Sequence, residues 1–404
     1  MHVAQLSLTN VRSFRRLELE LTPGLHVITG PNGSGKSNLL EAIALLATAR
    51  STRTTNDAEL IAWESLRDDP LPAARISARV RTAQEQVQVE VIVTTRGIAG
   101  GEAVGADPSA ATRRFRVNGV ARRASDLIGR LRVVLFSADD LAIIEGAPTL
   151  RRRYLDITIS QLDGTYVRTL QRYQRVLQQR NSLLRRLQER RAGTGGPGAM
   201  GAASELDFWD EELAQTGAVL HTMRASALAA LTRGAAERYA TFSPRADRLE
   251  VCYRPALPPE LAESLAHPPD DLAARILAAH VAGRPRDIQA GTTRIGPHRD
   301  DVAFLIGGHP AASSASRGEM RGIALALRLA EVELSIARTG DPPVLLLDDV
   351  LSELDADRRA RVLAAAFAVD QVLITSPDPD RPGRDEVASA RRYRLVDGAL
   401  EPIE

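Results

Sequence analysis

The sequence predicts an α/β protein in which a sheet-rich domain is built from both ends of the chain and a helical domain is inserted between them. Strand patterns dominate the N-terminal third, a helical apolar stripe follows from Thr149, and strand patterns return near the C-terminal end. These three observations together predict the division. We therefore expect residues 1–147 and 289–404 to form the sheet domain and residues 148–288 to form the helical insertion.

The N-terminal range has the alternation of half-buried strands. Residues 16–21, RLELEL, alternate leucine with glutamate, and residues 24–29, GLHVIT, form a short buried strand that ends at a glycine. The segments ARISARV and QVQVEVIV predict two further strands, followed by a glycine-rich loop near Gly100. Asn118-Gly119 is typical of a hairpin turn.

The middle of the chain changes to a helical pattern. Apolar residues recur at spacings of three, four or seven, at Tyr166, Leu170, Tyr173, Leu177, Leu184 and Leu187. Residues 193–204, GTGGPGAMGAAS, indicate a flexible linker, and a second helix is expected from near Glu205. We expect the two helices to form a hairpin or arm. After two proline-rich segments, GPHRDDVAFLIGG and PVLLLDD predict the returning strands, with a long helix between them.

Composition limits the possible classes of protein. A chain of 404 residues predicts two domains, and its net charge of +1 argues neither for nor against nucleic acid. The single cysteine, Cys252, excludes an internal disulfide framework. The N-terminus lacks a leader pattern and no apolar run approaches the length of a membrane span, so we expect a cytoplasmic protein without a membrane partner.

Residues 28–43, ITGPNGSGKSNLLEAI, contain Lys36, the single lysine among 52 lysine and arginine residues. An ammonium is a compact point charge, whereas a guanidinium is a wide planar fork, so position 36 is expected to need the smaller cation. Gly30, Gly35, Lys36 and Ser37 fit the template G-x-x-x-x-G-K-[ST] between a predicted strand and a predicted helix. The alternative is a glycine-rich turn with an incidental lysine.

This template predicts a cradle for the phosphates of ATP. Gly33 and Gly35 let backbone N–H groups turn inward, Lys36 reaches the β- and γ-phosphates, and Ser37 supplies an oxygen ligand to Mg²⁺. The expected nucleotide-binding residues here are Gly30, Pro31, Asn32, Gly33, Ser34, Gly35, Lys36, Ser37 and Asn38.

A pair of acids follows the apolar run 344–347 near the C-terminal end. Asp348 and Asp349 leave this predicted strand together, at the edge where α/β sheets bind ligands. We expect Asp348 to hold Mg²⁺ with Ser37, and Asp349 to polarise the attacking water, so that Asp348, Asp349 and Lys36 form the catalytic set. The alternative is an ordinary strand end capped by solvated acids.

Residues 316–321, SRGEMR, precede the long helix. Ser316 and Glu319 have the spacing of a capping box, which is one interpretation. A Ser-x-Gly-Glu sequence about thirty residues before the acidic strand also looks like the signature loop of ABC-type ATPases, and one hydroxyl can serve both roles. Ser316, Gly318 and Glu319 are therefore expected at the nucleotide. Ser352 and Asp355, in SELD, stand where ABC ATPases carry the D-loop, and Asp355 completes the expected set.

The order of NVRSF, GPNGSGKSN, VVLFSADDLAIIEGAPTLRRRYLD, GPHRDD, SRGEMR and LLLDDVLSELDADRR resembles the bacterial RecF family over nearly the whole chain. The resemblance implies an ABC-type P-loop ATPase head with a helical second domain, related to SMC proteins but without their long coiled coil. It implies ATP-driven homodimers that bind DNA gaps and junctions, act with RecO and RecR in loading RecA, and support replication-fork recovery and the SOS response. It also places Arg12, of NVRSF, at the nucleotide.

Three departures from the wider ABC pattern favour slow hydrolysis. Asp349 stands where most ABC ATPases have glutamate, Thr375-Ser376 occupy the place of the switch histidine, and VVLFSADD has no evident Q-loop glutamine nearby. We therefore expect a weak, DNA-stimulated ATPase that acts mainly as a switch. The alternative is another ABC-type ATPase, such as a transporter subunit, which should carry the missing glutamine and histidine, or an SMC-like ATPase.

One segment suggests a DNA contact. Between residues 168 and 191 the chain has one acid, Glu189, and eight arginines, at positions 168, 172, 175, 180, 185, 186, 190 and 191. A basic helix face can bind phosphates without reading sequence. The alternative is a solvated helix whose arginine stems cover apolar neighbours. For His298, in GPHRDD, we favour a structural turn residue over a catalyst.

Overall fold

The structure is a computed structural model that describes residues 1–95, 111–192, 199–242, 248–268, 270–351, 354, 356–366, 368–378 and 389–403. Cα proximity divides the chain into two compact units. Unit 1 consists of Met1–Asp140 with Leu325–Glu404, and unit 2 consists of Leu141–Ala324. The three ranges expected from the sequence stay a prediction.

The first sheet of unit 1 is antiparallel, in the order β2-β1-β4-β5-β6-β7. Its strands are β1 (His2–Val11), β2 (Phe14–Glu20), β4 (Ala73–Arg81), β5 (Gln86–Thr94), β6 (Thr112–Val117) and β7 (Val120–Arg122). Buried and exposed residues alternate along β4, as in a sheet with one face on the core. The expected hairpin turn joins β6 to β7, where Asn118 and Gly119 have φ of 52° and 78°.

The second sheet of unit 1 is mostly parallel, in the order β15-β14-β3-β13-β12-β8. Its strands are β3 (Gly24–Thr29), β8 (Val133–Phe136), β12 (Val344–Asp348), β13 (Gln371–Ser376), β14 (Arg391–Val396) and β15 (Ala399–Ile403). The central strands β3, β13 and β12 come from opposite ends of the chain and are buried over most of their length. Both chain ends are therefore needed to complete this sheet.

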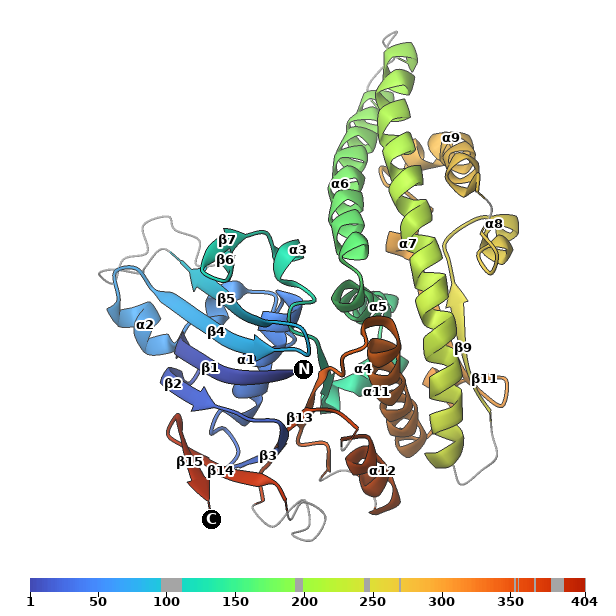
Figure 1. Cartoon of the computed structure of the whole chain (residues 1–404). Helices are drawn as coiled ribbons and strands as arrows, with labels where there is room; N and C mark the ends of the chain where they lie inside the picture. Colours follow the sequence, from blue (N-terminus) through green and yellow to red (C-terminus); the bar gives the residue numbers. More distant parts are fainter. Residues whose placement is uncertain are drawn as a thin grey trace. The chain divides into compact units, whose positions relative to one another are not determined.

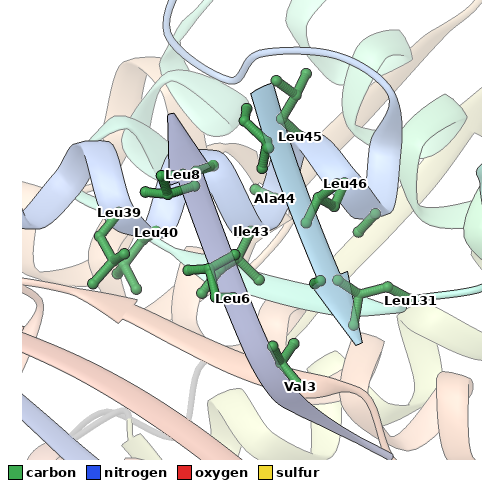
Figure 2. Packing of buried hydrophobic residues seen from close by; sticks show 14 of the residues in the cluster. Val3, Leu6, Leu8, Leu39, Leu40, Ile43, Ala44, Leu45, Leu46 and Leu131 are labelled. Carbon is green, nitrogen blue, oxygen red and sulfur yellow. The ribbon is translucent and has the colours of Figure 1, made fainter. Parts of the chain in front are cut away.

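Helix α1 (Lys36–Thr48) lies in the core of unit 1. Every residue from Leu39 to Thr48 is buried, so the helix must be covered on all sides. Strands β4 and β5 of the first sheet and β8, β12 and β13 of the second all contact it. Figure 2 shows Leu6 and Leu8 of β1 lying over its leucines. Because both sheets pack on α1, the start of the helix is held in place. The P-loop, residues 30–37, ends at this start.

Shorter helices complete unit 1. They are η1 (Asp57–Leu60), α2 (Trp63–Asp68), α3 (Ala124–Leu127), η2 (Ala138–Asp140) and α12 (Ala356–Ala366). Helix α11 (Arg317–Thr339) begins in unit 2 and ends in unit 1. Across the described ranges, no helix has the length and apolar character that crossing a bilayer would need.

Unit 2 is mainly helical. Helices α6 (Gly164–Ala192) and α7 (Ala199–Phe242) run antiparallel, side by side (Figure 1), and bury Leu184 against Leu206. The other helices are α4 (Leu141–Glu145), α5 (Pro148–Leu162), α8 (Pro259–Ser264), α9 (Leu272–Ala290), η3 (Pro297–Arg299) and α10 (Ala311–Ser314). A small antiparallel sheet has the order β11-β10-β9, from β9 (Leu249–Arg254), β10 (Asp301–Ile306) and β11 (His309–Pro310).

Two local expectations differ from the structure. The segment 193–204 was expected to be a linker throughout, but α7 already begins at Ala199, because alanine and methionine there favour helix despite Gly201. The strand expected in GPHRDDVAFLIGG, β10, pairs with β9 within unit 2 rather than with the sheets of unit 1. The expected loop at Gly100 lies outside the described residues.

Candidate nucleotide-binding site

The strand order brings the two predicted motifs to one edge of the second sheet. Strand β13 lies between β3, which leads into the P-loop, and β12, which ends in the acids. Thr375 of β13 is paired with Ile28 on one side and with Asp348 on the other. Because all three strands are parallel, their carboxyl ends meet at the edge where such sheets bind ligands.

The P-loop conformation depends on glycine at two positions. A Cβ on Gly30 would lie 2.6 Å from the carbonyl oxygen of Leu395, and a Cβ on Gly35, whose φ is 105°, would collide with the Ser13 hydroxyl. Ser34 Oγ is buried and has no hydrogen-bond partner within the described part of the chain. A close backbone approach with an unsatisfied hydroxyl is what a phosphate-binding loop presents to its ligand.

Lys36 is held by the loop itself. Its Nζ donates hydrogen bonds to the carbonyl oxygens of Gly30, at 2.7 Å, and Pro31, at 2.9 Å. Burial lowers the pKa of Lys36, whereas the nearby Asp349 and Asp348 carboxylates raise it. Both acids therefore lie close enough to act on the ammonium. The P-loop also leaves Pro31, Asn32 and Gly33 exposed.

Ser37 and Asp348 meet across 311 positions of sequence. Ser37 Oγ donates to Asp348 Oδ1 at 2.9 Å. The same carboxylate oxygen accepts a hydrogen bond from Thr375 Oγ1 at 2.7 Å. Asp349 has a φ of 53°, and its backbone N–H donates to Thr375 Oγ1 at 3.0 Å. The two acids thus make different contacts with Thr375, and their expected division of roles stays a prediction.

Arg12 lies beside α1 and is paired with a buried acid. Its guanidinium makes two hydrogen bonds to Glu41, at 3.0 and 3.1 Å, and Ser51 donates to the same carboxylate. Glu41 is 2% exposed within an otherwise apolar stretch of helix. Sequence reasoning missed Glu41, although one acid inside LLEAIALL was the signal that could have revealed it.

Asn38 links the P-loop helix to two neighbouring segments. Its side chain donates to Ser13 Oγ at 3.1 Å and accepts from Arg53 Nη1 at 2.9 Å. The exposed Arg53 was not singled out from the sequence, because nothing distinguishes it from the other arginines of so arginine-rich a chain. It places a cation at the start of α1, next to the P-loop.

The predicted signature residues form a capping box at the start of α11. Glu319 N donates to Ser316 Oγ at 3.3 Å, and Ser316 N donates to Glu319 Oε2 at 2.7 Å. Ser316 is exposed, and Gly318 and Glu319 are partly exposed. The Ser316 hydroxyl also lies 2.8 Å from Glu319 Oε2, so the cap is closed by its own carboxylate while Ser316 stays exposed. Asp355 and Ser352, the predicted D-loop residues, lie outside the described residues.

Asp300, in the GPHRDD segment, accepts hydrogen bonds from three separate segments of unit 2. Arg224 Nη1 of α7 donates to Asp300 Oδ2 at 2.8 Å, the Tyr253 hydroxyl of β9 donates to the same oxygen, and Ala256 N donates to Oδ1. Burial opposes ionisation of Asp300, but bonds to His221, Arg224 and Tyr253 outweigh it and lower its pKa. This carboxylate ties a helix, a strand and a loop together.

His298 has both ring nitrogens bonded. Nδ1 lies 2.7 Å from the Tyr173 hydroxyl of α6, and Nε2 lies 3.1 Å from the Thr293 carbonyl oxygen. Burial lowers the pKa of His298 to about 4, so the ring is neutral near pH 7. The contacts fit the structural role that we favoured for this residue.

The arginines of α6 divide into two groups. Arg180 is fully buried and bonds to Asp210 at 2.6 Å and Asp287 at 2.8 Å. Its inclusion in a DNA-facing surface was wrong, because its charge is neutralised inside unit 2. Six others are exposed: Arg168, Arg172, Arg175, Arg185, Arg186 and Arg190. The structure describes the backbone of Arg191 but not its side chain.

Comparison with known proteins decides the family. The model described as the RecF/RecN/SMC N terminal domain matches residues 2–381. The DNA replication and repair protein RecF of Chloroflexus aurantiacus is 44% identical over 402 residues, which cover 99% of both chains. This chain belongs to the RecF family. RecF of Roseiflexus castenholzii is 42% identical over 406 residues, with both chains covered completely.

Solved structures agree with this assignment. A structure of the recombination mediator protein RecF-ATPrS in the RecFOR pathway matches with a TM-score of 0.80 and 28% identity, covering 100% of this chain and 98% of that one. An Smc head domain from Pyrococcus furiosus shares the fold alone, at 15% identity and a TM-score of 0.51. The match covers 100% of this chain and 96% of that one. The predicted fold class, an ABC-type α/β head built from both chain ends with a helical insertion, is confirmed.

Proposed function

We propose that this RecF-family chain acts in DNA replication and repair as an ATP-dependent DNA-binding protein, in which bound ATP joins two copies and slow hydrolysis separates them. The observation that best supports the proposal is the hydrogen bond between Ser37 and Asp348. It joins the P-loop to the acidic strand, which is the pairing that a P-loop ATPase needs. The solved RecF structures that this fold matches were described with ATP and with ATPrS.

The P-loop would bind the triphosphate. Backbone N–H groups of residues 32–38 would surround the phosphates, with Ser34 Oγ as a further donor, since it is buried without a partner in the described chain. Lys36 would exchange its two carbonyl contacts for phosphate oxygens, which accept stronger charge-assisted hydrogen bonds. Arg12 would contact the nucleotide from beside α1, where two hydrogen bonds to Glu41 fix its guanidinium.

Ser37 and Asp348 fit a magnesium site. A hydroxyl and a carboxylate oxygen in hydrogen-bond contact are a donor set that suits this hard cation, with phosphates and water supplying the remaining ligands. Bound Mg²⁺ would neutralise charge that develops on the phosphate oxygens. Asp349 would orient the attacking water. Its side chain is one methylene shorter than the glutamate of most ABC ATPases, which supports slow turnover and a switch rather than a motor.

The signature residues would act on the nucleotide of a second copy. Ser316 is exposed at the N-terminus of α11, so its hydroxyl and the helix dipole can meet the γ-phosphate held by a partner's P-loop. For this the Ser316 hydroxyl would exchange its contact with Glu319 for a phosphate oxygen. Gly318 would allow close approach, and Asp355 would contribute from the D-loop.

Helix α6 offers a surface for DNA phosphates. Arg168, Arg172, Arg175, Arg186 and Arg190 fall within about 60° of one helix face and span about 33 Å, at 3.6 residues per turn and 1.5 Å per residue. All five are exposed, and only Arg172 among them has a salt bridge in the described chain, to Glu212. Such a stripe would hold a duplex backbone without reading its sequence.

Membership of the RecF family supports a proposal for the biological setting. RecF structures that match this chain are described as recombination mediators of the RecFOR pathway. We accordingly propose that this chain binds gapped or junction DNA in the cytoplasm and acts with RecO and RecR in loading RecA. Replication-fork recovery and SOS induction would depend on the same activity.

The test is binding of the purified protein to gapped and intact duplexes, with and without ATP. ATP should tighten binding to gapped DNA about tenfold or more, since couplings between sites are typically 1–3 kcal/mol. Lys36→Met should abolish the effect of ATP. Equal affinity with and without ATP would contradict the proposal.

The α6 surface is tested by exchanging Arg168, Arg175 and Arg186 together for glutamine. Affinity for DNA should fall. The slope of log affinity against log salt concentration should become shallower by the amount expected for the loss of about three phosphate contacts. Arg185→Gln is the matched control, because Arg185 is exposed on the same helix but about 100° away from the stripe. An equal loss in the control, or unchanged affinity in the triple variant, would remove α6 from the DNA interface.

A further inference from the structure

Thr375 occupies a central position that neither the P-loop nor the acidic strand explains. It lies near the end of β13, between the strand that leads into the P-loop and the strand that ends in the acids. Its side chain is almost completely buried, at 1% exposure. In the wider ABC pattern the switch histidine stands at this place in the sequence, and a threonine hydroxyl has a different chemistry.

The hydroxyl of Thr375 contacts both acids at once. A hydroxyl has one proton to donate and two lone pairs to accept with. Its donor contact is to Asp348 Oδ1 at 2.7 Å, since the alternative acceptor, the carbonyl oxygen of Leu347, is farther away at 3.4 Å. It accepts from the backbone N–H of Asp349 at 3.0 Å. One side chain therefore bridges the expected metal acid and the expected catalytic acid.

The contact to Asp349 is made where the backbone has an uncommon conformation. With φ of 53° Asp349 lies in the left-handed region, which residues other than glycine adopt only occasionally, although aspartate tolerates it better than most. The bond from its N–H to Thr375 Oγ1 fixes that conformation immediately after β12. Asp348 Oδ1 accepts hydrogen bonds from both Ser37 Oγ and Thr375 Oγ1, which fixes the rotamer of the carboxylate.

We propose that Thr375 is a positioning residue for ATP hydrolysis, which holds Asp348 and Asp349 in register with the P-loop from within the sheet. This inference rests on the proposed ATPase function and adds a residue to it. Thr375 would act through the two acids, whereas a switch histidine acts on the γ-phosphate directly. Nucleotide binding should depend less on Thr375 than hydrolysis does, because the P-loop contacts do not involve it and Asp348 keeps its hydrogen bond from Ser37.

Three variants separate positioning from simple packing. Thr375→Val keeps the shape but removes the hydroxyl, and Thr375→Ser keeps the hydroxyl but removes a methyl group. Ser376→Ala is the matched control: Ser376 is the next residue of β13, is also buried, and bonds to Asp378 rather than to the acids. For each protein, kcat, KM, the dissociation constant of a fluorescent ATP analogue with Mg²⁺ and with EDTA, and the unfolding temperature are measured.

Thr375→Val should lower kcat on the order of 10- to 100-fold, the cost of misplacing a reacting group by about an ångström. Its nucleotide dissociation constant in EDTA should stay within about threefold of wild type, since the P-loop contacts remain. With Mg²⁺ the dissociation constant should rise by a smaller factor than kcat falls, because Asp348 keeps its hydrogen bond from Ser37. Thr375→Ser should restore most of kcat, and Ser376→Ala should resemble wild type in kcat.

Four results would overturn the inference. They are an unchanged kcat in Thr375→Val, an equal loss in Thr375→Ser, an equal loss in Ser376→Ala, and loss of nucleotide binding in Thr375→Val in proportion to kcat. Failure of the proposed function is distinguishable, because a wild-type protein that neither binds nor hydrolyses ATP would exclude both the ATPase and this role for Thr375.

Discussion

The most specific expectation concerns the single lysine of the chain. Lys36→Arg preserves the charge at the P-loop but replaces a compact ammonium with a wider, planar guanidinium. In the structure Lys36 Nζ fits between two carbonyl oxygens, at 2.7 Å from Gly30 and 2.9 Å from Pro31. The loop cannot widen easily, because Gly30 and Gly35 already lie against Leu395 and Ser13. We therefore expect Lys36→Arg to lose the phosphate contact.

The size of the loss follows from the type of contact. A hydrogen bond to a charged group contributes about 1.5–3 kcal/mol, which corresponds to roughly 10- to 150-fold in affinity. Crowding by the larger side chain in a closely packed loop adds a cost of about 1–3 kcal/mol. The affinity for ATP should therefore fall by at least about tenfold, although the net charge is unchanged.

The assay is titration with a fluorescent ATP analogue in the presence of Mg²⁺. Lys36→Met provides the reference for complete loss of the cation, and Lys36→Arg should resemble it. Arg16→Lys, the reverse exchange at an exposed site on β2, is the control. It shows whether exchanging arginine and lysine away from the P-loop changes the affinity for ATP. A dissociation constant for Lys36→Arg within about twofold of wild type would refute the claim that position 36 needs the smaller cation.

Two further predictions concern the acids and the buried imidazoles. Asp349→Asn should leave ATP binding intact but stall hydrolysis and trap the dimer. Asp348→Asn should weaken Mg²⁺-dependent binding of ATP itself. Equal loss of ATP binding in both variants would disprove this division of roles. Burial lowers the pKa of His298 to about 4 and of His280 to about 3, so the unfolded chain, with histidine pKa near 6.5, binds more protons as the pH falls below that value. Stability against urea should therefore fall between pH 6.0 and 4.5, by about 2 kcal/mol for each histidine, and His280→Leu should remove about half of that fall; an unchanged slope would assign it to other groups.

Much of the fold was predictable because its strongest patterns are local. The alternation in β4 and β5, the turn at Asn118-Gly119 and the apolar run of β12 each fix one element without reference to the rest of the chain. The start of α7 was not predictable, since glycine in the preceding segment suggested a linker while alanine continued the helix.

The site was predictable where a motif has a fixed spacing, and less so where contacts are long-range. The P-loop and the acids could be located individually, but the bonds of Thr375 to Asp348 and Asp349 depend on the order of three strands that the sequence does not state. Arg180 shows the opposite error. A basic run on a helix does not reveal which arginine meets acids from α7 and α9 in the interior.

The central claim is that one ATP site is shared by two copies of the chain. Sedimentation of Ser316→Arg, of Lys36→Met and of their equimolar mixture, each with and without ATP, tests it most directly. We predict that neither variant dimerises alone and that the mixture forms ATP-dependent heterodimers, because an intact P-loop on one subunit then meets an intact signature on the other. ATP-driven dimers of Ser316→Arg alone, or no dimers in a mixture of two variants with wild-type unfolding temperatures, would contradict the shared site.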